Sequence, residues 1–403
     1  PRAPLSTERA TRPRAPRPAP ERPRTPGQRV REALAEARSG SAVGRLFHRL
    51  FAAIFLIAWL SLAAQIDLLV GRRGLLPVAP FLALAEAQGS SFLDLPTFLR
   101  WTGGSDTALH AGISAGALLC VAALLGLRPR LCLGLSTFLY LGYAVSCRQF
   151  LGFQWDNLLL ECGLLAALLP VDRRAPLVHL LFRVLLFKLY WESGLAKWQS
   201  PLHDWQDGSA MSFYYETAPI PARLAHAFHA LPEFWHQLES WFTLFFELIL
   251  PFAIFAPRRF RLGAAAVFTF FQIVNIVTAN YGFFSYLALS LHVFLVSEGD
   301  LVRARRALER RLPALHRMRV RARALRIRGA RRSPFQQLGR VLWSFVPAAR
   351  QGMIRVSALR VVAFAYLSIS LLEGAAHFGG APGLLEPIAA LRAVYAPFRL
   401  VNN

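Results

Sequence analysis

Apolar and polar residues alternate in long blocks along this chain of 403 residues. Nine blocks are mainly apolar and have about the length that a helix needs to cross the roughly 30 Å hydrocarbon core of a bilayer. They cover residues 49–70, 108–127, 131–150, 151–170, 176–198, 234–255, 262–278, 283–296 and 354–372. The pattern predicts an all-α fold, a polytopic transmembrane helical bundle of about nine spans. A shorter, proline-broken block at 75–87 is predicted to be re-entrant or interfacial.

The polar blocks divide the chain into segments. The first of them is rich in proline and arginine and has no apolar periodicity, which predicts a disordered tail. In order, the expected segments are a disordered basic tail (1–44), an eight-span bundle (45–298) with a long external loop (199–233), an arginine-rich cytoplasmic connector (299–350), a ninth span (351–375) and an external tail (376–403).

Arginine is concentrated between the apolar blocks, with twelve in the first fifty residues and fourteen in residues 301–340. A cytoplasmic N-terminus places the arginine-rich turns on the cytoplasmic side, in agreement with the positive-inside rule. Arg72, Arg73 and Arg148 oppose this topology. Because most of the arginines cluster beside the predicted spans, we interpret the net charge of +23 as a feature that fixes the orientation of a membrane protein. It predicts no nucleic-acid partner, because the basic runs lack interleaved aromatic residues.

Composition and motifs exclude several kinds of functional site. The chain is 55% hydrophobic and 17% charged, which is less charge than a soluble domain carries. The four cysteines lie within or beside apolar blocks and form no CxxC pair, so neither disulfides nor a zinc site is predicted. The histidines show no metal-binding spacing, and the sequence has no phosphate-binding or nucleophile-elbow motif. No cofactor is predicted.

The two lysines of the chain, Lys188 and Lys197, both lie in or next to one predicted span. The other basic residues are arginines, which stay charged, whereas a buried lysine can lose its proton. The pattern favours a titratable amine at one or both positions. Chance placement of two lysines within ten residues is the alternative.

Charged residues at membrane depth are costly, so each one is a candidate functional group. The acids Asp156, Glu161 and Glu247 lie inside predicted spans. Lys188 and Glu192 are four residues apart and can pair on one helix face. The alternative is that these acids only neutralise the basic residues of the bundle.

Two further groups of polar and aromatic residues are candidates. Gln272, Asn275, Thr278 and Asn280 recur about every three residues and form one polar helix face, which favours hydrogen bonding between spans over a substrate path. The external loop carries four candidate functional residues, Trp205, Tyr214, Tyr215 and Glu216. They predict an interfacial aromatic belt, a contact surface for a secreted client, or a lid over the intramembrane cluster.

Several stretches together resemble the lipase maturation factor family. They are Phe150-Leu151-Gly152-Phe153-Gln154-Trp155-Asp156 with Leu158-Leu159-Leu160-Glu161, Trp205 with Tyr214-Tyr215-Glu216-Thr217 and Pro219, Phe255-Ala256-Pro257-Arg258-Arg259, and Asn280-Tyr281-Gly282-Phe283-Phe284. The similarity runs from about residue 45 to the end. It implies a membrane protein that assists folding and assembly of secreted lipases and that lies in the endoplasmic reticulum of eukaryotes. The arginine-rich composition favours a bacterial homologue in the inner membrane.

Members of that family continue beyond the segment similar to 397–402 into a soluble, β-rich domain. The resemblance therefore implies that residues 376–403 begin such a domain and that part of a client-binding surface lies outside this chain. The partners that it implies are a secreted lipase-type client and the lipid bilayer.

A weaker resemblance covers residues 185–215. Tyr190, Gly194, Lys197, Trp205 and Gly208 are similar to the membrane part of vitamin K-dependent gamma-carboxylase. Carried over, that resemblance makes Lys197 an intramembrane base that acts on a lipid-soluble cofactor.

A non-enzymatic maturation factor is thus the first functional hypothesis. A membrane enzyme that uses Lys197 with Lys188 and Glu192 is the second, and a transporter with a path along Gln272, Asn275 and Glu247 is the third. The preferred site is Lys197 with the loop from Trp205 to Glu216. An intramembrane polar network is expected to support it, made of Gln154, Trp155, Asp156, Glu161, Glu247, Asn275, Asn280 and Tyr281.

Overall fold

The computed structural model describes residues 41–172, 174–218, 221–312 and 348–378. Within these ranges every regular element is a helix, which confirms the predicted all-α class. In chain order the elements are α2 (Ala42–Val70), α3 (Val78–Ala87), η1 (Phe98–Thr102), α4 (Asp106–Leu124), α5 (Pro129–Ser146), α6 (Arg148–Leu151), α7 (Gln154–Leu168), α8 (Pro176–Trp198), α9 (Asp204–Asp207), α10 (Ala210–Thr217), α11 (Ala225–His229), α12 (Glu233–Leu244), η2 (Phe245–Ile249), η3 (Leu250–Ile254), α13 (Arg258–Thr278), α14 (Phe284–Leu291), η4 (His292–Leu295), α15 (Glu298–Arg311) and α18 (Ala348–Phe378).

Each of the nine predicted apolar blocks forms a helix or a run of helices, but the expected count of nine spans is not confirmed. Five helical stretches of the described chain are long and apolar enough to cross a membrane: Ala42–Val70, Asp106–Leu124, Glu233–Ile254, Arg258–Thr278 and Ala358–Ala376. A sixth is obtained if Phe284–Leu295 and Glu298–Arg311, bent by 108°, are one span. Helix α7 has only 15 residues. Helix α8 carries four charged side chains, which the bundle itself must accommodate.

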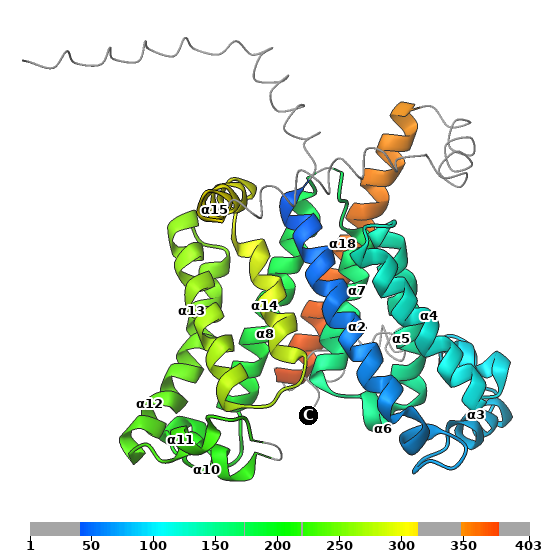
Figure 1. Ribbon diagram of the computed structural model, residues 1–403, viewed down its shortest axis with the longest axis horizontal. Coiled ribbons are helices and arrows are strands. Elements are labelled where there is room, and N and C mark those ends of the chain that lie inside the picture. The colour runs from blue at the N-terminus through cyan, green and yellow to red at the C-terminus, as the bar shows by residue number, and fades with distance from the viewer. Residues whose placement is uncertain (1–40, 173, 219–220, 313–347, 379–403) are drawn as a thin grey trace, which may run out of the picture. The chain divides into compact units, whose positions relative to one another are not determined.

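The arginine-rich turns gather at one end of the bundle, together with α15, while α3, α6, α10 and α11 lie at the other end (Figure 1). At the arginine-rich end, Arg130 donates to the Ala167 carbonyl (2.9 Å) and Arg45 donates to the Val171 carbonyl (3.2 Å). These guanidinium groups satisfy carbonyls at and just beyond the C-terminal end of α7. The grouping of the turns agrees with the alternation predicted from the sequence.

A column of aromatic rings on α2 forms the centre of the core. Phe47, Phe51, Phe55 and Trp59 are spaced by four residues, so they share one helix face, and all four are fully buried. The Trp59 indole donates to Ser136 Oγ on α5 at 2.8 Å. This column is where the N-terminal helices meet.

Two glycines let helices approach closely. A Cβ atom at Gly163 of α7 would lie 1.9 Å from Thr137 Oγ1 of α5, and one at Gly116 of α4 would lie 2.3 Å from the Trp59 ring. Small residues at such contacts allow tight packing between membrane helices.

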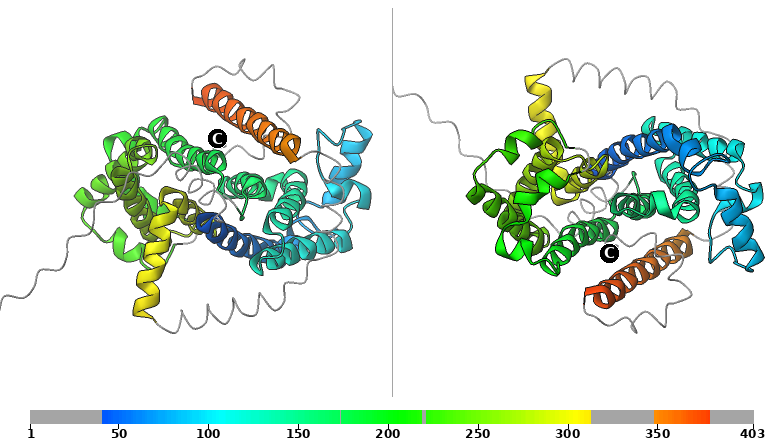
Figure 2. Two further views of the ribbon diagram at one scale, coloured as in Figure 1. Left: turned by 90° about the horizontal axis from the view of Figure 1, so that it is seen from above. Right: turned by 90° about the horizontal axis from the view of Figure 1, so that it is seen from below.

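Helix α18 packs beside α8 and lies on one flank of the bundle (Figure 2). Tyr366 donates to Glu161 Oε2 at 2.6 Å, and Lys188 donates to Ser370 Oγ at 3.2 Å. Polar contacts with α7 and α8 therefore hold this helix in place.

The first helix begins at Ala42, earlier than the predicted span and inside the segment predicted as a disordered tail. Ser41 caps it by accepting from the Gly44 N–H, and Glu298 Oε2 accepts from the Ala42 N–H at 2.7 Å. Both contacts satisfy donors that a helix N-terminus leaves free. The rest of the predicted tail, most of the arginine-rich connector and the segment after residue 378 lie outside the described residues.

Candidate functional site

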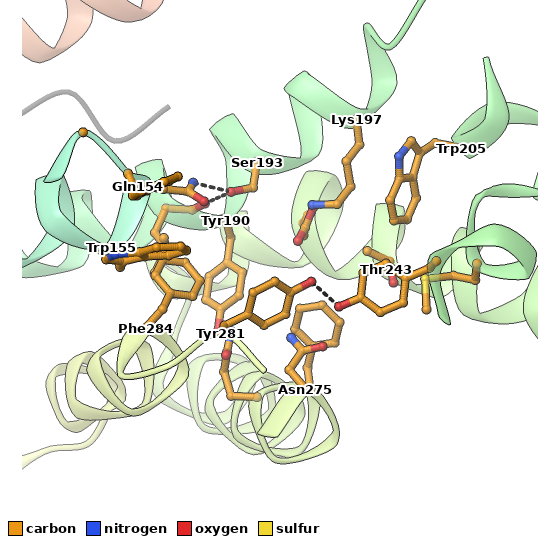
Figure 3. A pocket seen from close by; sticks show the side chains of 18 residues that line it. Gln154, Trp155, Tyr190, Ser193, Lys197, Trp205, Thr243, Asn275, Tyr281 and Phe284 are labelled. Carbon is orange, nitrogen blue, oxygen red and sulfur yellow. Dashed lines mark hydrogen bonds and ion pairs between the residues drawn. The ribbon is translucent and has the colours of Figure 1, made fainter. Parts of the chain in front are cut away.

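A cavity of about 400 Å³ lies among α8, η2, α13, the start of α7 and the short helices of the loop at 199–233 (Figure 3). It joins residues that are far apart in the sequence. The lining residues are Gly152, Phe153, Gln154, Trp155, Leu189, Tyr190, Ser193, Lys197, Trp205, Met211, Tyr214, Thr243, Glu247, Phe271, Gln272, Asn275, Tyr281 and Phe284.

An ion pair forms part of the wall. Lys197 Nζ lies 2.7 Å from Glu247 Oε2 and 5.3 Å from the centre of the Trp205 ring. The Glu247 side chain is 8% exposed and that of Lys197 is 26% exposed. A carboxylate and an aromatic face both attract an ammonium group, so both contacts stabilise this arrangement of the Lys197 side chain.

Local geometry brings these two side chains together. Glu247 lies in η2, a π-helical turn, which is a helix distortion that is frequent at functional sites. A Cβ atom at Gly194 of α8 would lie 2.9 Å from the Glu247 Cβ. Glycine at this position therefore allows α8 to approach η2 closely enough for the pair to form.

A second ion pair lies outside the cavity. Lys188 Nζ lies 3.1 Å and 3.2 Å from the two carboxylate oxygens of Glu161 on α7, which is fully buried. Glu192, the partner suggested by helix spacing, lies one turn further along α8 and lines a different cavity with Lys188. The structure thus favours a structural, charge-neutralising role for Lys188 and Glu161.

Asp156 is also not part of the cavity. Its carboxylate accepts from the Tyr140 hydroxyl at 2.6 Å and from the Phe153 N–H at 3.3 Å, so it caps the start of α7. That cap helps to position one wall of the cavity, because Gln154 and Trp155 line the cavity from the same first turn of α7. Gln154 Nε2 donates to Ser193 Oγ on α8 at 3.2 Å.

The wall formed by α8 and α13 carries a chain of hydrogen bonds. Gln272 Nε2 donates to the Tyr190 hydroxyl at 3.2 Å, and this hydroxyl lies 3.0 Å from His292 Nε2. The other ring nitrogen, Nδ1, lies 3.0 Å from Thr269 Oγ1. Asn275, one turn along α13 from Gln272, also faces the cavity, as labelled in Figure 3.

The aromatic residues of the loop cover the cavity. Trp205 and Tyr214 line it, and the Tyr214 and Tyr281 hydroxyls hydrogen-bond to each other across it (Figure 3). The neighbouring residue Tyr215 is buried and donates to Glu239 Oε1 at 3.2 Å. Burial, together with the nearby Glu239 charge, raises the pKa of Tyr215 above its ordinary value. The geometry favours the lid among the three roles predicted for this loop.

Two further predicted residues, Glu216 and Asn280, also lie away from the cavity. Glu216 is exposed and lies 3.5 Å from His229. Asn280 is exposed in the turn between α13 and α14, where its side chain accepts from the Gly282 N–H.

Several lining residues were not predicted as site residues, among them Tyr190, Ser193, Thr243 and Phe284, although Tyr190 and Phe284 belong to the stretches that carry the two resemblances. Tyr190 and Ser193 precede Lys197 by seven and four residues, so helix periodicity alone places them on its face. No sequence spacing predicted that His292 would contact Tyr190. Among the described residues no group of three or more His, Cys, Asp or Glu side chains could hold a metal ion.

Comparison with known proteins locates the chain in a family. The family model described as the lipase maturation factor transmembrane domain matches residues 42–303, a range that includes every residue of the cavity. No solved structure gives a significant match to the chain.

Curated relatives agree with this match. Lipase maturation factor 2 of Gallus gallus is 35% identical in an alignment of 282 residues that covers 64% of this chain and 39% of that protein. The Homo sapiens protein of the same name is 34% identical in an alignment of 292 residues that covers 65% of this chain and 41% of that protein. Lipase maturation factor 1 of Bos taurus is 27% identical in an alignment of 296 residues that covers 68% of this chain and 52% of that protein.

The chain thus spans about two-fifths to one-half of the length of these relatives. The match of the family model covers well over half of the chain, and the apolar helices are those of an integral membrane protein. The chain belongs to the lipase maturation factor family.

Proposed function

We propose that this membrane bundle serves as a maturation factor that assists secreted lipases, or clients of similar kind, to fold or assemble into active enzyme. The observation that carries the proposal is the family match over residues 42–303, which spans the bundle from α2 into α15. The names of the curated relatives supply the client class.

The proposal includes an orientation. The end with α15 and the arginine-rich turns is placed in the cytoplasm, following the positive-inside rule. The end with α10 and α11 then faces the compartment in which a secreted client folds. The arginine-rich composition supports the bacterial inner membrane as the location, with the endoplasmic reticulum as its counterpart in eukaryotic relatives.

Client contact is proposed for the exposed side of that end. Leu202 is 78% exposed and Phe213 is 58% exposed, and both belong to the loop whose Trp205 and Tyr214 turn inward. Exposed apolar side chains beside charged ones such as Glu216 are typical of a protein-binding surface.

The test is complementation in a strain that lacks the gene. The strain receives the wild-type gene, Phe213→Ala or Phe260→Ala, and the secreted lipase is assayed for activity per amount of lipase protein. Phe260 is a phenylalanine of similar exposure in the first turn of α13, at the arginine-rich end of the bundle. We expect deletion and Phe213→Ala to lower specific activity, while Phe260→Ala matches the wild type. Unchanged specific activity in the deletion strain would refute the proposal.

A second candidate is a membrane enzyme with Lys197 as a base. Its support is that Lys197 lines the cavity and lies against Glu247, which can accept a proton. Lys197→Arg keeps the charge and removes the titratable amine. Full lipase maturation by this variant contradicts the enzymatic alternative and leaves the maturation role standing.

A further inference from the structure

The charges of the cavity are balanced. Among its lining residues Lys197 and Glu247 are the charged ones, and they pair with each other at 2.7 Å. An anionic or cationic ligand would bring an uncompensated charge into a site of low solvent exposure, which is unfavourable. The site therefore suits a neutral ligand.

One buried acceptor points to a ligand with a hydrogen-bond donor. Gln272 is 3% exposed and lines the cavity, and its Nε2 is engaged by the Tyr190 hydroxyl. Its Oε1 is buried and has no donor among the described residues. A buried acceptor left without a donor is costly, so a ligand that supplies one gains affinity.

The ion pair has hydrogen-bonding capacity for the same kind of ligand. An ammonium has three N–H donors, and Lys197 uses one on Glu247 and directs its charge at the Trp205 ring. The Glu247 carboxylate has further lone pairs beyond the one that Lys197 uses. A hydroxyl both donates and accepts, so it matches the pair and the Gln272 acceptor.

The remaining wall is aromatic. Trp155, Phe271, Phe284 and Trp205 line the cavity between helices of the membrane bundle (Figure 3). Such walls favour an apolar portion of the ligand. A volume of about 400 Å³ is within the usual range for small-molecule sites.

We propose that this cavity binds a neutral, hydroxyl-bearing lipid of the monoacylglycerol type. Its hydroxyl groups bond to Gln272 Oε1 and to the Lys197–Glu247 pair, and its chain lies against the aromatic walls. A lipid-binding site is a property separate from the proposed maturation role. Its test needs no lipase, so the two proposals can fail independently.

The test uses the purified chain in phosphatidylcholine nanodiscs with four probes. They are 1-monooleoylglycerol, methyl oleate without the hydroxyls, oleic acid with an anionic head, and glycerol without the chain. The variants are Gln272→Leu and Gln65→Leu, a matched control at an exposed glutamine of α2 that bonds only to Ser61 among the described residues.

We expect 1-monooleoylglycerol to bind the wild type and Gln65→Leu equally, and Gln272→Leu about tenfold more weakly, the effect of losing one hydrogen bond. Methyl oleate, oleic acid and glycerol should each bind at least tenfold more weakly than 1-monooleoylglycerol. If Gln272→Leu fails to fold, Gln272→Met, which also lacks the acceptor and is closer to glutamine in shape, takes its place with the same expectation. Equal binding of oleic acid, methyl oleate or glycerol would overturn the proposal, as would unchanged binding by the folded cavity variants.

Discussion

The Lys197 ammonium and the Glu247 carboxylate lie 2.7 Å apart and join the last turn of α8 to the π-helical turn after α12. The two residues are separated by 50 positions in the chain. Each side chain supplies the counter-charge of the other at a position of low solvent exposure.

Glu247→Gln is expected to destabilise the protein because it leaves the Lys197 charge without its partner. We expect a loss of about 1–3 kcal/mol in unfolding free energy, less than for a fully buried pair because Lys197 is partly exposed. The double variant Lys197→Gln, Glu247→Gln should recover part of the loss, since no unpaired charge remains. Thermal unfolding in detergent micelles measures this, and a double variant no more stable than Glu247→Gln would contradict the account.

Tyr366→Phe tests the attachment of α18. The substitution removes the 2.6 Å hydrogen bond to the buried Glu161, which also binds Lys188. We expect a loss of about 1–2 kcal/mol. The matched control is Tyr286→Phe, because Tyr286 is exposed on α14. If the two variants unfold at the same temperature, the contact with Glu161 does not stabilise α18.

Gly163→Ala tests the close packing of α5 and α7. The added methyl group would lie 1.9 Å from Thr137 Oγ1, so one of the helices must shift. A loss of about 1–3 kcal/mol or failure to accumulate is expected. Gly263→Ala is the control, because a Cβ atom there meets nothing within 4 Å and alanine favours the helix. Equal stability of Gly163→Ala and the wild type would show that the helices pack less tightly.

Tyr215 provides a pH-dependent contribution to stability. Burial and the Glu239 charge raise its pKa in the folded state, so the neutral phenol is favoured by folding. That contribution is complete below the ordinary tyrosine pKa of about 10 and is lost as pH rises towards the higher folded value. Tyr215→Phe should therefore show a shallower fall in unfolding temperature between about pH 9 and 11 than the wild type. Tyr286→Phe is the control, and parallel curves for wild type and Tyr215→Phe would contradict the assignment.

The helical fold was predictable because the thickness of a bilayer sets the length of the apolar runs that cross it. Runs such as those of α2 and α4 must be apolar over a fixed length, and both were found, although the start of α2 at Ala42 lies earlier than the predicted residue 49. The count of spans was not predictable in the same way. Helices α7 and α8 carry charged side chains that are neutralised by partners on other helices. The hydropathy of these two helices therefore does not indicate whether they cross the membrane.

Some residues of the cavity were predictable from the sequence, but the contacts between them were not. Lys197, Trp205 and Tyr214 were identified because lysine and clustered aromatic residues are unusual beside a span. Glu247 and Tyr281 were predicted as members of the supporting network, but which residue each would contact was not, since pairing across helices depends on packing. Lys188 meets Glu161 on another helix, and Tyr190 meets His292 across 102 positions, a contact that no local spacing encodes.

The contact between Glu298 and the start of α2 bears on the order in which the protein is made. The carboxylate that accepts from the Ala42 N–H enters the chain 256 residues after it. While the ribosome produces the intervening helices, the first turn of α2 must find its hydrogen-bond partners in water or lipid headgroups. The bundle acquires its final N-terminal contact only after α14 has been synthesised, so its maturation ends late in translation.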